Sequence, residues 1–227
     1  MEKFKLQSIC KNIGRGVNVL EDTTEDKISY YEVKISNFIG NDISIDENDI
    51  NNNGKYSQIA NKQLEKGDIL IPLRRGTASG NKIAIYNLDM DIPVIVSHHI
   101  FVIRPKQNIV NSFYLLFYFL NISEEMNSNE LNIMKKSGLV AINIKYLKDL
   151  DIPLPSLEEQ VRAEEYFNVS QQMYTFSNEL KTFHKTYYEN VVNTSDTASL
   201  DNNTSRLKDI LSSATDVFKD INSSISK

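Results

Sequence analysis

Short apolar runs bounded by turn-forming residues dominate the first 150 positions of this chain. The runs that are rich in β-branched and aromatic residues predict β-strands at Ser29–Ile35, Asp68–Leu73, Lys82–Tyr86, Val94–Val96 and Ile100–Arg104. Turn-prone clusters such as Asn51–Gly54 and Gly76–Asn81 separate them. Two helices are expected between the strands, roughly Ser112–Leu120 and Asn129–Lys136, the second with Ser128 as its N-cap. The pattern predicts a mixed α/β domain of the α+β class.

A different pattern begins after Pro153 and Pro155, which end the globular part. Ser156 and Glu159 fit a capping box, in which each side chain accepts a backbone N–H at a helix start. Behind this box, apolar residues alternate at spacings of three and four: Tyr166, Val169, Met173, Phe176, Leu180, Phe183 and Tyr187. This heptad stripe predicts a helix that packs along its length on another helix. A helix lying on the surface of its own domain is the alternative.

The end of the chain carries a second helical pattern. Asn193–Thr204 is polar and lacks periodicity, which predicts a linker. Beyond it the same spacing recurs in Leu207, Ile210, Ala214, Val217 and Ile221. Such a short helix is marginal alone, so we expect it to dock on the first helix or on another chain. The predicted organisation is a globular domain over 1–154, a coiled-coil helix over 155–193, a linker over 194–205 and an amphipathic helix over 206–227.

Charge and composition narrow the class of protein. The net charge is −5, yet residues 54–150 carry 12 basic and 8 acidic side chains, a net +4. Such a basic block is compatible with a phosphate-binding face, although an ordinary solvated surface would look similar. The apolar cluster Phe113–Leu120 is too short to span a membrane. Met1–Gln7 shows no secretory signal, and the one cysteine, Cys10, cannot form an intramolecular disulfide, so we expect a cytoplasmic protein.

An ordered series of segments resembles the target recognition domain of type I restriction-modification specificity (S) subunits. The most specific part is Lys135–Gln160, KKSGLVAINIKYLKDLDIPLPSLEEQ, read as a basic Ser-Gly loop, a short helix, a strand and the start of a long helix. Earlier segments of the series are Phe4–Gly16, Lys66–Gly76, Ser97–Pro105 and Asn111–Leu120. Each segment is degenerate alone, but their order and spacing are much more specific. The resemblance covers residue 4 to about residue 190.

The resemblance implies a function in DNA recognition. Known S subunits carry two target recognition domains joined by two long helices, whereas one such domain is visible here. The chain is therefore similar to a half S subunit that dimerises through its helix and reads both half-sites of a bipartite palindrome. Such subunits work with DNA methyltransferase (modification) subunits. The 22 residues from Tyr166 to Tyr187 would span about 33 Å as a helix, which is about one turn of B-DNA.

Two polar segments are candidate DNA contacts. The first is a loop between β-rich runs that contains Arg74, Arg75, Thr77, Ser79, Asn81 and Lys82. Arg can pair with guanine O6 and N7, Asn can pair with adenine, and Lys suits a phosphate. The second segment contains Lys135, Lys136, Ser137, Asn143 and Lys145. A Ser-Gly turn beside two lysines can bind a phosphate, whereas Asn143 could serve only as an N-cap. For the first segment the alternative is a solvated hairpin tip.

No residue pattern supports catalysis or a resident cofactor. Phosphate-binding glycine motifs, a nucleophile elbow and an adenine-methyltransferase tetrad are not found in the sequence. Glu32-Val33-Lys34, with Asp22 or Asp26 before it, matches the E-x-K of metal-dependent nucleases, a triplet common by chance. His98 and His99 would point to opposite faces of a strand, which is poor geometry for a shared metal, although either could touch DNA.

Three functions from different classes fit these observations. The first is a DNA-recognition subunit that has no enzymatic activity of its own. The second is a stand-alone DNA-binding protein on the same domain, such as a regulator or a plasmid-transfer accessory factor. The third is a mimic of the S subunit that binds the methyltransferase and ignores DNA.

Overall fold

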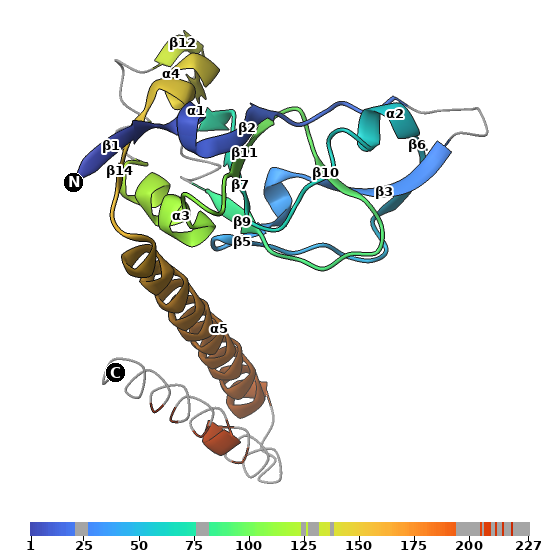
Figure 1. Cartoon of the computed structure of the whole chain (residues 1–227). Helices are drawn as coiled ribbons and strands as arrows, with labels where there is room; N and C mark the ends of the chain where they lie inside the picture. The colour runs from blue at the N-terminus through green and yellow to red at the C-terminus, as the bar shows by residue number, and fades with distance from the viewer. Residues whose placement is uncertain are drawn as a thin grey trace. The chain divides into compact units, whose positions relative to one another are not determined.

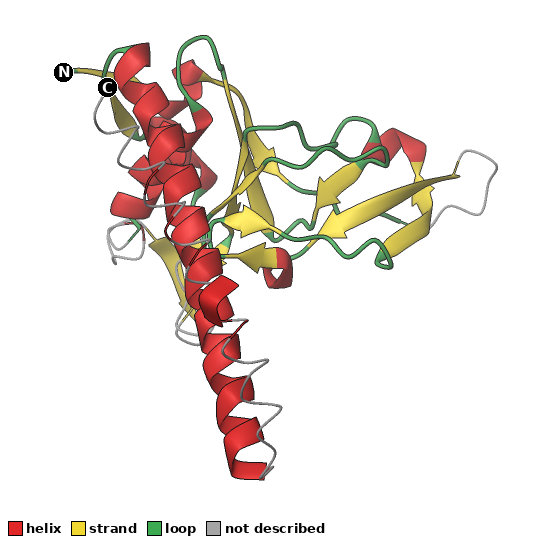
Figure 2. Ribbon diagram, turned by 90° about the horizontal axis from the view of Figure 1, so that it is seen from below, coloured by secondary structure: helices red, strands yellow, loops and turns green. Residues whose placement is uncertain are grey.

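The chain folds into two compact units, Met1–Glu164 and Glu165–Lys227. The computed structural model describes residues 1–20, 27–75, 82–123, 126, 132–136 and 139–193, together with seven helical residues between 205 and 219. Strands dominate the first unit, and one continuous helix dominates the described part of the second (Figures 1 and 2).

The centre of the first unit is a four-stranded antiparallel sheet. Its order is β2 (Cys10–Arg15), β11 (Ile100–Pro105), β7 (Asp68–Pro72) and β9 (Ala84–Tyr86). The two central strands, β7 and β11, are buried almost throughout. A strand covered on both faces requires a continuous apolar run, which explains why both strands could be predicted from the sequence.

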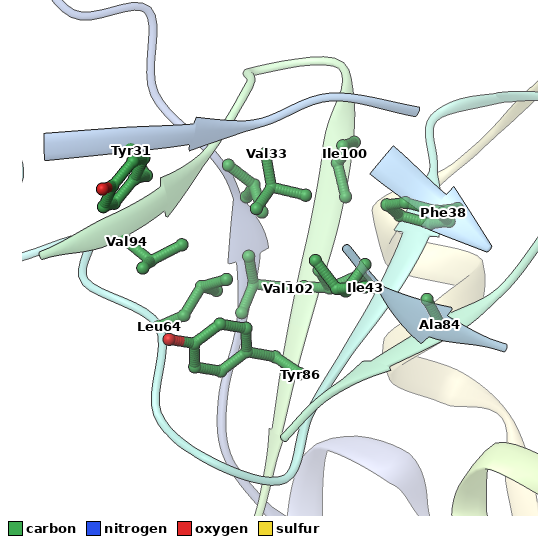
Figure 3. Close-up of a cluster of buried hydrophobic side chains, with 12 residues drawn as sticks. Tyr31, Val33, Phe38, Ile43, Leu64, Ala84, Tyr86, Val94, Ile100 and Val102 are labelled. Carbon is green, nitrogen blue, oxygen red and sulfur yellow. The ribbon is translucent and has the colours of Figure 1, made fainter. Parts of the chain in front are cut away.

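A second sheet lies across an apolar core from the first. It has the order β10 (Val94–Val96), β3 (Lys27–Val33) and β6 (Ile50–Lys55), and β10 pairs with β3 in parallel. Figure 3 shows side chains of this core from both sheets pointing toward one another, with Phe38 of β4 (Phe38–Ile39) and Ile43 of β5 (Asp42–Ile43) beside them. Burial of these apolar groups holds the two sheets together.

A buried ion pair crosses the central sheet. The Arg104 guanidinium of β11 donates from Nε and Nη2 to the two carboxylate oxygens of Asp68 on β7, at 2.8 and 2.7 Å. Asp68 is fully buried, and it also accepts the Glu65 N–H at 2.9 Å. Burial raises the pKa of the Asp68 carboxyl, and the hydrogen bonds from Arg104 and Glu65 oppose that shift. Asp68 therefore depends on Arg104 to remain charged in the core.

The residue before Asp68 also has a structural requirement. Gly67 has φ +88°, and a Cβ at this position would lie 2.6 Å from Oγ of Ser112. Any L-residue with a side chain would be strained there and would collide with the start of α3 (Ser112–Asn121). Gly67 and Asp68 thus both have structural roles, one through its backbone conformation and the other through its buried ion pair.

The N-terminal strand pairs with the strand that precedes the long helix. β1 (Glu2–Lys5) and β14 (Asp151–Leu154) form a two-stranded antiparallel sheet, with Lys5 and Asp151 joined by an ion pair at 2.8 Å. Two short helices, α1 (Leu6–Ile9) and α4 (Ile144–Asp149), lie against each other beside it. The hydroxyl groups of Tyr114 and Tyr118 on α3 donate to carbonyl groups of β14. These contacts fix β14 on the globular unit.

The long helix α5 (Leu157–Asn193) begins at the predicted capping box. Glu159 N–H donates to Ser156 Oγ at 3.3 Å, and Ser156 N–H donates to the Glu159 carboxylate at 2.9 Å. The Ser156 hydroxyl also donates to the Glu159 carboxylate, at 2.8 Å, and this bond together with the one from the Ser156 N–H lowers the pKa of the Glu159 carboxyl. Gln160 is buried and accepts the Asn111 N–H at 2.8 Å, which ties the first turn of α5 to the start of α3. The SLEEQ segment therefore begins α5 and anchors its first turn to α3.

Most predicted elements agree with the structure, but several were wrong. The segment predicted as a helix over Asn129–Lys136 contains instead the strand β12 (Asn132–Lys136), while Ser128 lies outside the described residues. Leu139–Ile142, for which no strand was predicted, is the strand β13. Asn51–Gly54 was predicted as a turn but belongs to β6. Pairing with a distant strand outweighed local propensity in these segments.

The second helical pattern lies largely outside the described residues. The described positions Ser205, Leu207, Lys208, Asp209, Ser212, Thr215 and Lys219 are helical. They belong to the same compact unit as α5 from Glu165 onward. Among the described residues, no helix is both long and apolar enough to cross a bilayer.

Replacing Asp68 with Asn should lower the free energy of unfolding by about 1–3 kcal/mol, because Arg104 loses its hydrogen bonds to a buried carboxylate but keeps its ion pair with Glu65. The substitution leaves the Arg104 guanidinium next to a neutral amide. Urea denaturation followed by circular dichroism measures this loss. A matched control is Asp89→Asn, which removes the exposed Lys66–Asp89 pair and should cost less than about 1 kcal/mol. Equal losses in the two variants would contradict a special role for the buried pair.

Candidate nucleic-acid interface

A small three-stranded sheet brings two separate basic segments together. Its order is β12, β13 and β8 (Arg74–Arg75), and both pairings are antiparallel. Val140 of β13 lies opposite Lys135 on one side and opposite Arg75 on the other. Ala141 lies opposite Arg74, and Leu139 lies opposite Lys136. The two basic dipeptides, 74–75 and 135–136, are thus both bonded to one central strand.

Leu73 connects this sheet to the central sheet. Its carbonyl accepts the Ile142 N–H at 2.9 Å, which continues the ladder of β13. Its own N–H donates to the His99 carbonyl at 2.7 Å, next to the start of β11. Both backbone groups of one residue are therefore used to join two sheets. Arg74 follows directly and is exposed to solvent.

His98 and His99 form a turn between β10 and β11 rather than part of a strand. Their exposed rings lie together, with centroids 3.8 Å apart and planes tilted by 42°. Partial loss of hydration lowers the pKa of His99, and the charges of His98 and Arg74 lower it further, while Glu32 opposes the shift. The prediction that the two rings would point to opposite faces of a strand was wrong. Among the described residues, no group of three or more potential ligands could hold a metal ion.

The segment after β13 opens the short helix α4. Asn143 is its N-cap, and the side-chain oxygen accepts the Lys145 N–H at 2.9 Å. The capping role considered for Asn143 is thus present. Lys145 is exposed at the same end of the helix. Both residues come within three positions of the end of β13, the central strand of the sheet β12-β13-β8, which is called the basic sheet below.

The other sequence-predicted contacts are not all part of this arrangement. Lys82 is half-buried, and its ammonium group donates to the Phe38 carbonyl at 3.3 Å. Thr77, Ser79, Asn81 and Ser137 lie outside the described residues. All eleven candidate DNA contacts stay predictions at this point.

The residues considered for catalysis do not form a site among the described positions. Glu32 lies on β3 and is half-buried, whereas Asp22 and Asp26 lie outside the described residues. Cys10 is buried, and loss of hydration raises the pKa of its thiol to about 12. That thiol is protonated at neutral pH and is a poor nucleophile.

The heptad stripe on α5 is only partly covered within the chain. Tyr166 is 72% exposed and Met173 is 50% exposed. Val169, Phe176 and Leu180 are half-buried, and Phe183 is buried. The side chain of Tyr187 lies outside the described residues. The exposed end of the stripe leaves large apolar groups in water, which is typical of a surface that receives another helix.

Comparison with known proteins assigns the family. A model of the type I restriction modification DNA specificity domain matches residues 1–181. The chain therefore belongs to this family. A putative type I restriction enzyme MjaX specificity subunit from Methanocaldococcus jannaschii is 30% identical over 161 residues, 70% of this chain and 36% of that protein.

Two solved structures have a similar fold. One is a chain from a study of complex assembly and conformational transition of the type I R-M system, with a TM-score of 0.54 and 18% identity. The other is the S subunit of a type I restriction-modification system from M. genitalium, with a TM-score of 0.52 and 14% identity. The matches cover 96% and 88% of this chain but 45% and 47% of those chains. This chain thus spans between about a third and a half of these relatives.

Substitutions of Asn143 test its role as the N-cap of α4. We expect Asn143→Ala to lower the free energy of unfolding by about 1 kcal/mol because the Lys145 N–H loses its acceptor. Asn143→Ser keeps a capping oxygen, so its free energy of unfolding should stay within about 0.5 kcal/mol of the wild-type value. Thermal denaturation of the two variants measures this difference. Equal stability of the alanine variant and wild type would refute the cap.

Proposed function

We propose that the Met1–Glu164 unit reads a DNA sequence for a DNA methyltransferase or restriction complex. One observation carries the proposal most directly. Two basic segments far apart in the sequence, 74–75 and 135–136, pair with the same strand β13. Positive charge gathered in one sheet, within a chain of net charge −5, is expected of a local phosphate-binding face.

The residues of this face have distinct chemical roles in the proposal. Arg74 and Arg75 offer guanidinium groups that match guanine O6 and N7 in the major groove. Lys135 and Lys136 are point charges suited to the phosphates on either side. Thr77, Ser79 and Asn81 belong to the segment that follows β8, and we assign them to base contacts as well. Lys82, Ser137, Asn143 and Lys145 are assigned to the DNA backbone.

The chain is proposed to act through partners rather than by its own chemistry. The family is named for DNA specificity in type I restriction modification, and the matched relative is a specificity subunit. We therefore propose modification subunits as the partners that use the bound site. No resident cofactor is required for such a role.

We further propose that two copies associate through the heptad stripe of α5. The exposed Tyr166 and Met173 supply unpaired apolar surface for this contact. A two-fold dimer presents the same DNA-reading face twice, so its target would be a bipartite palindrome.

Selection of bound duplexes from a random pool tests the proposal. The full-length protein is used at low and high salt, and its mass in solution is measured alongside. Enrichment of one bipartite palindrome by a dimer supports the proposal. If nothing is enriched, the selection is repeated with the modification subunit present. Failure in both cases would favour a protein that binds the methyltransferase and ignores DNA.

Alanine substitutions distinguish base contacts from phosphate contacts. Arg74→Ala and Arg75→Ala should each cost about 1–3 kcal/mol on the selected site and relax base preference at one position. Lys135→Ala should weaken binding to all duplexes nearly equally and reduce the salt dependence. Fluorescence anisotropy on the selected duplex and on single-base variants measures both effects. Uniform loss for an arginine variant would reassign that arginine to a phosphate.

Charge introduced on the exposed part of the heptad stripe should separate the dimer. We expect Tyr166→Asp with Met173→Asp to give monomers by light scattering, because each carboxylate would be buried against an apolar partner. Tyr174→Asp is a matched control, since Tyr174 is 44% exposed on the same helix but lies outside the stripe. A dimer that survives the double substitution would exclude this surface.

A further inference from the structure

The His98–His99 turn lies next to the basic sheet, although neither residue belongs to it. The His99 carbonyl accepts the Leu73 N–H at 2.7 Å, and Arg74 follows Leu73 in the chain. Both rings are exposed and lie 3.8 Å apart between their centroids. Partial loss of hydration and the charge of His98 lower the pKa of His99, and the positive charge of Arg74 acts in the same direction.

We propose that the His98–His99 turn is a further DNA-contacting segment, and that uptake of a proton by this histidine pair strengthens the binding of DNA. The inference rests on the proposed function, because it extends the same face. Imidazole rings are suited to this position for two reasons. A neutral ring can donate or accept a hydrogen bond at a base edge, and a protonated ring carries a charge that favours a phosphate.

The surroundings of the pair set the direction of the pH effect. In the free protein, partial loss of hydration and the charges of His98 and Arg74 lower the pKa of His99, while Glu32 on β3 acts in the opposite direction. A DNA phosphate brought to the turn would favour the charged imidazole and raise its pKa. The bound form therefore holds more protons than the free form between these two pKa values. Binding strengthens as the pH falls through that window.

The short distance between the two rings limits the number of protons involved. Two positive charges with ring centroids 3.8 Å apart repel each other. One linked proton changes the affinity by at most about tenfold per pH unit.

The test measures the affinity of the full-length protein for the selected duplex between about pH 5.5 and about pH 8. Wild type should bind more tightly as the pH falls, with a slope between zero and one proton. His98→Gln with His99→Gln keeps hydrogen-bonding groups but cannot titrate, so its slope should be flat. His99→Lys carries a charge across this range and should bind at neutral pH as tightly as, or more tightly than, wild type.

A control variant uses the remaining histidine of the chain. His184 is exposed on α5, and His184→Gln should retain the wild-type slope, with its mass in solution checked in parallel. If wild type binds the selected duplex specifically and the double glutamine variant shows the same pH slope as wild type, this inference is overturned. The proposed function would remain intact. Absence of DNA binding by wild type, with and without the modification subunit, would overturn both.

Discussion

The geometry of the first unit depends on the ion pair between Asp68 and Arg104. A fully buried carboxylate needs a charged, hydrogen-bonded partner, and here a single guanidinium donates to both of its oxygens. The same guanidinium reaches the Glu65 carboxylate at 2.6 Å and the Gln63 carbonyl at 2.8 Å. A shift of β7 along β11 that moved Asp68 away from Arg104 would leave the buried carboxylate without its charged partner. The pair therefore selects one alignment of the two central strands.

The alignment of β7 and β11 also sets the position of the candidate interface, which begins a few residues after the end of β7. β7 ends at Pro72, and Leu73 then bonds to the His99 carbonyl on one side and to the Ile142 N–H on the other. Arg74 and Arg75 are consequently delivered to β13, which also pairs with β12. A two-residue strand such as β8 has little stability of its own. The position of β8 therefore depends on β7, which precedes it, and on β13, which pairs with it.

The long helix is attached to this framework by a different set of interactions. The capping box fixes where α5 begins, and Gln160 ties its first turn to the N-terminus of α3. From Glu165 onward the helix belongs to the second unit. The globular unit and the helical unit thus carry separate tasks in the proposal, namely DNA reading and association.

Features of the fold that depend on local or periodic residue patterns could be predicted from the sequence. Buried strands such as Val94–Val96, the helix Ser112–Asn121 and the capping box at Ser156 depend on burial or on hydrogen bonds between close neighbours, and each leaves a pattern in consecutive residues. The family resemblance had the same basis, because it rested on the order of such segments.

Only the tertiary structure decided which of these segments meet. β12 and β13 have weak local signals, and their backbone groups are satisfied by pairing that includes a strand some 60 residues earlier in the chain. From the sequence, Arg74 was expected in a loop and Lys135 at the end of a separate helix beside a Ser-Gly turn, and no contact of either with His98 or His99 was predicted. Their convergence depends on long-range backbone pairing, and that pairing is decided by the fold as a whole rather than by any short stretch of residues.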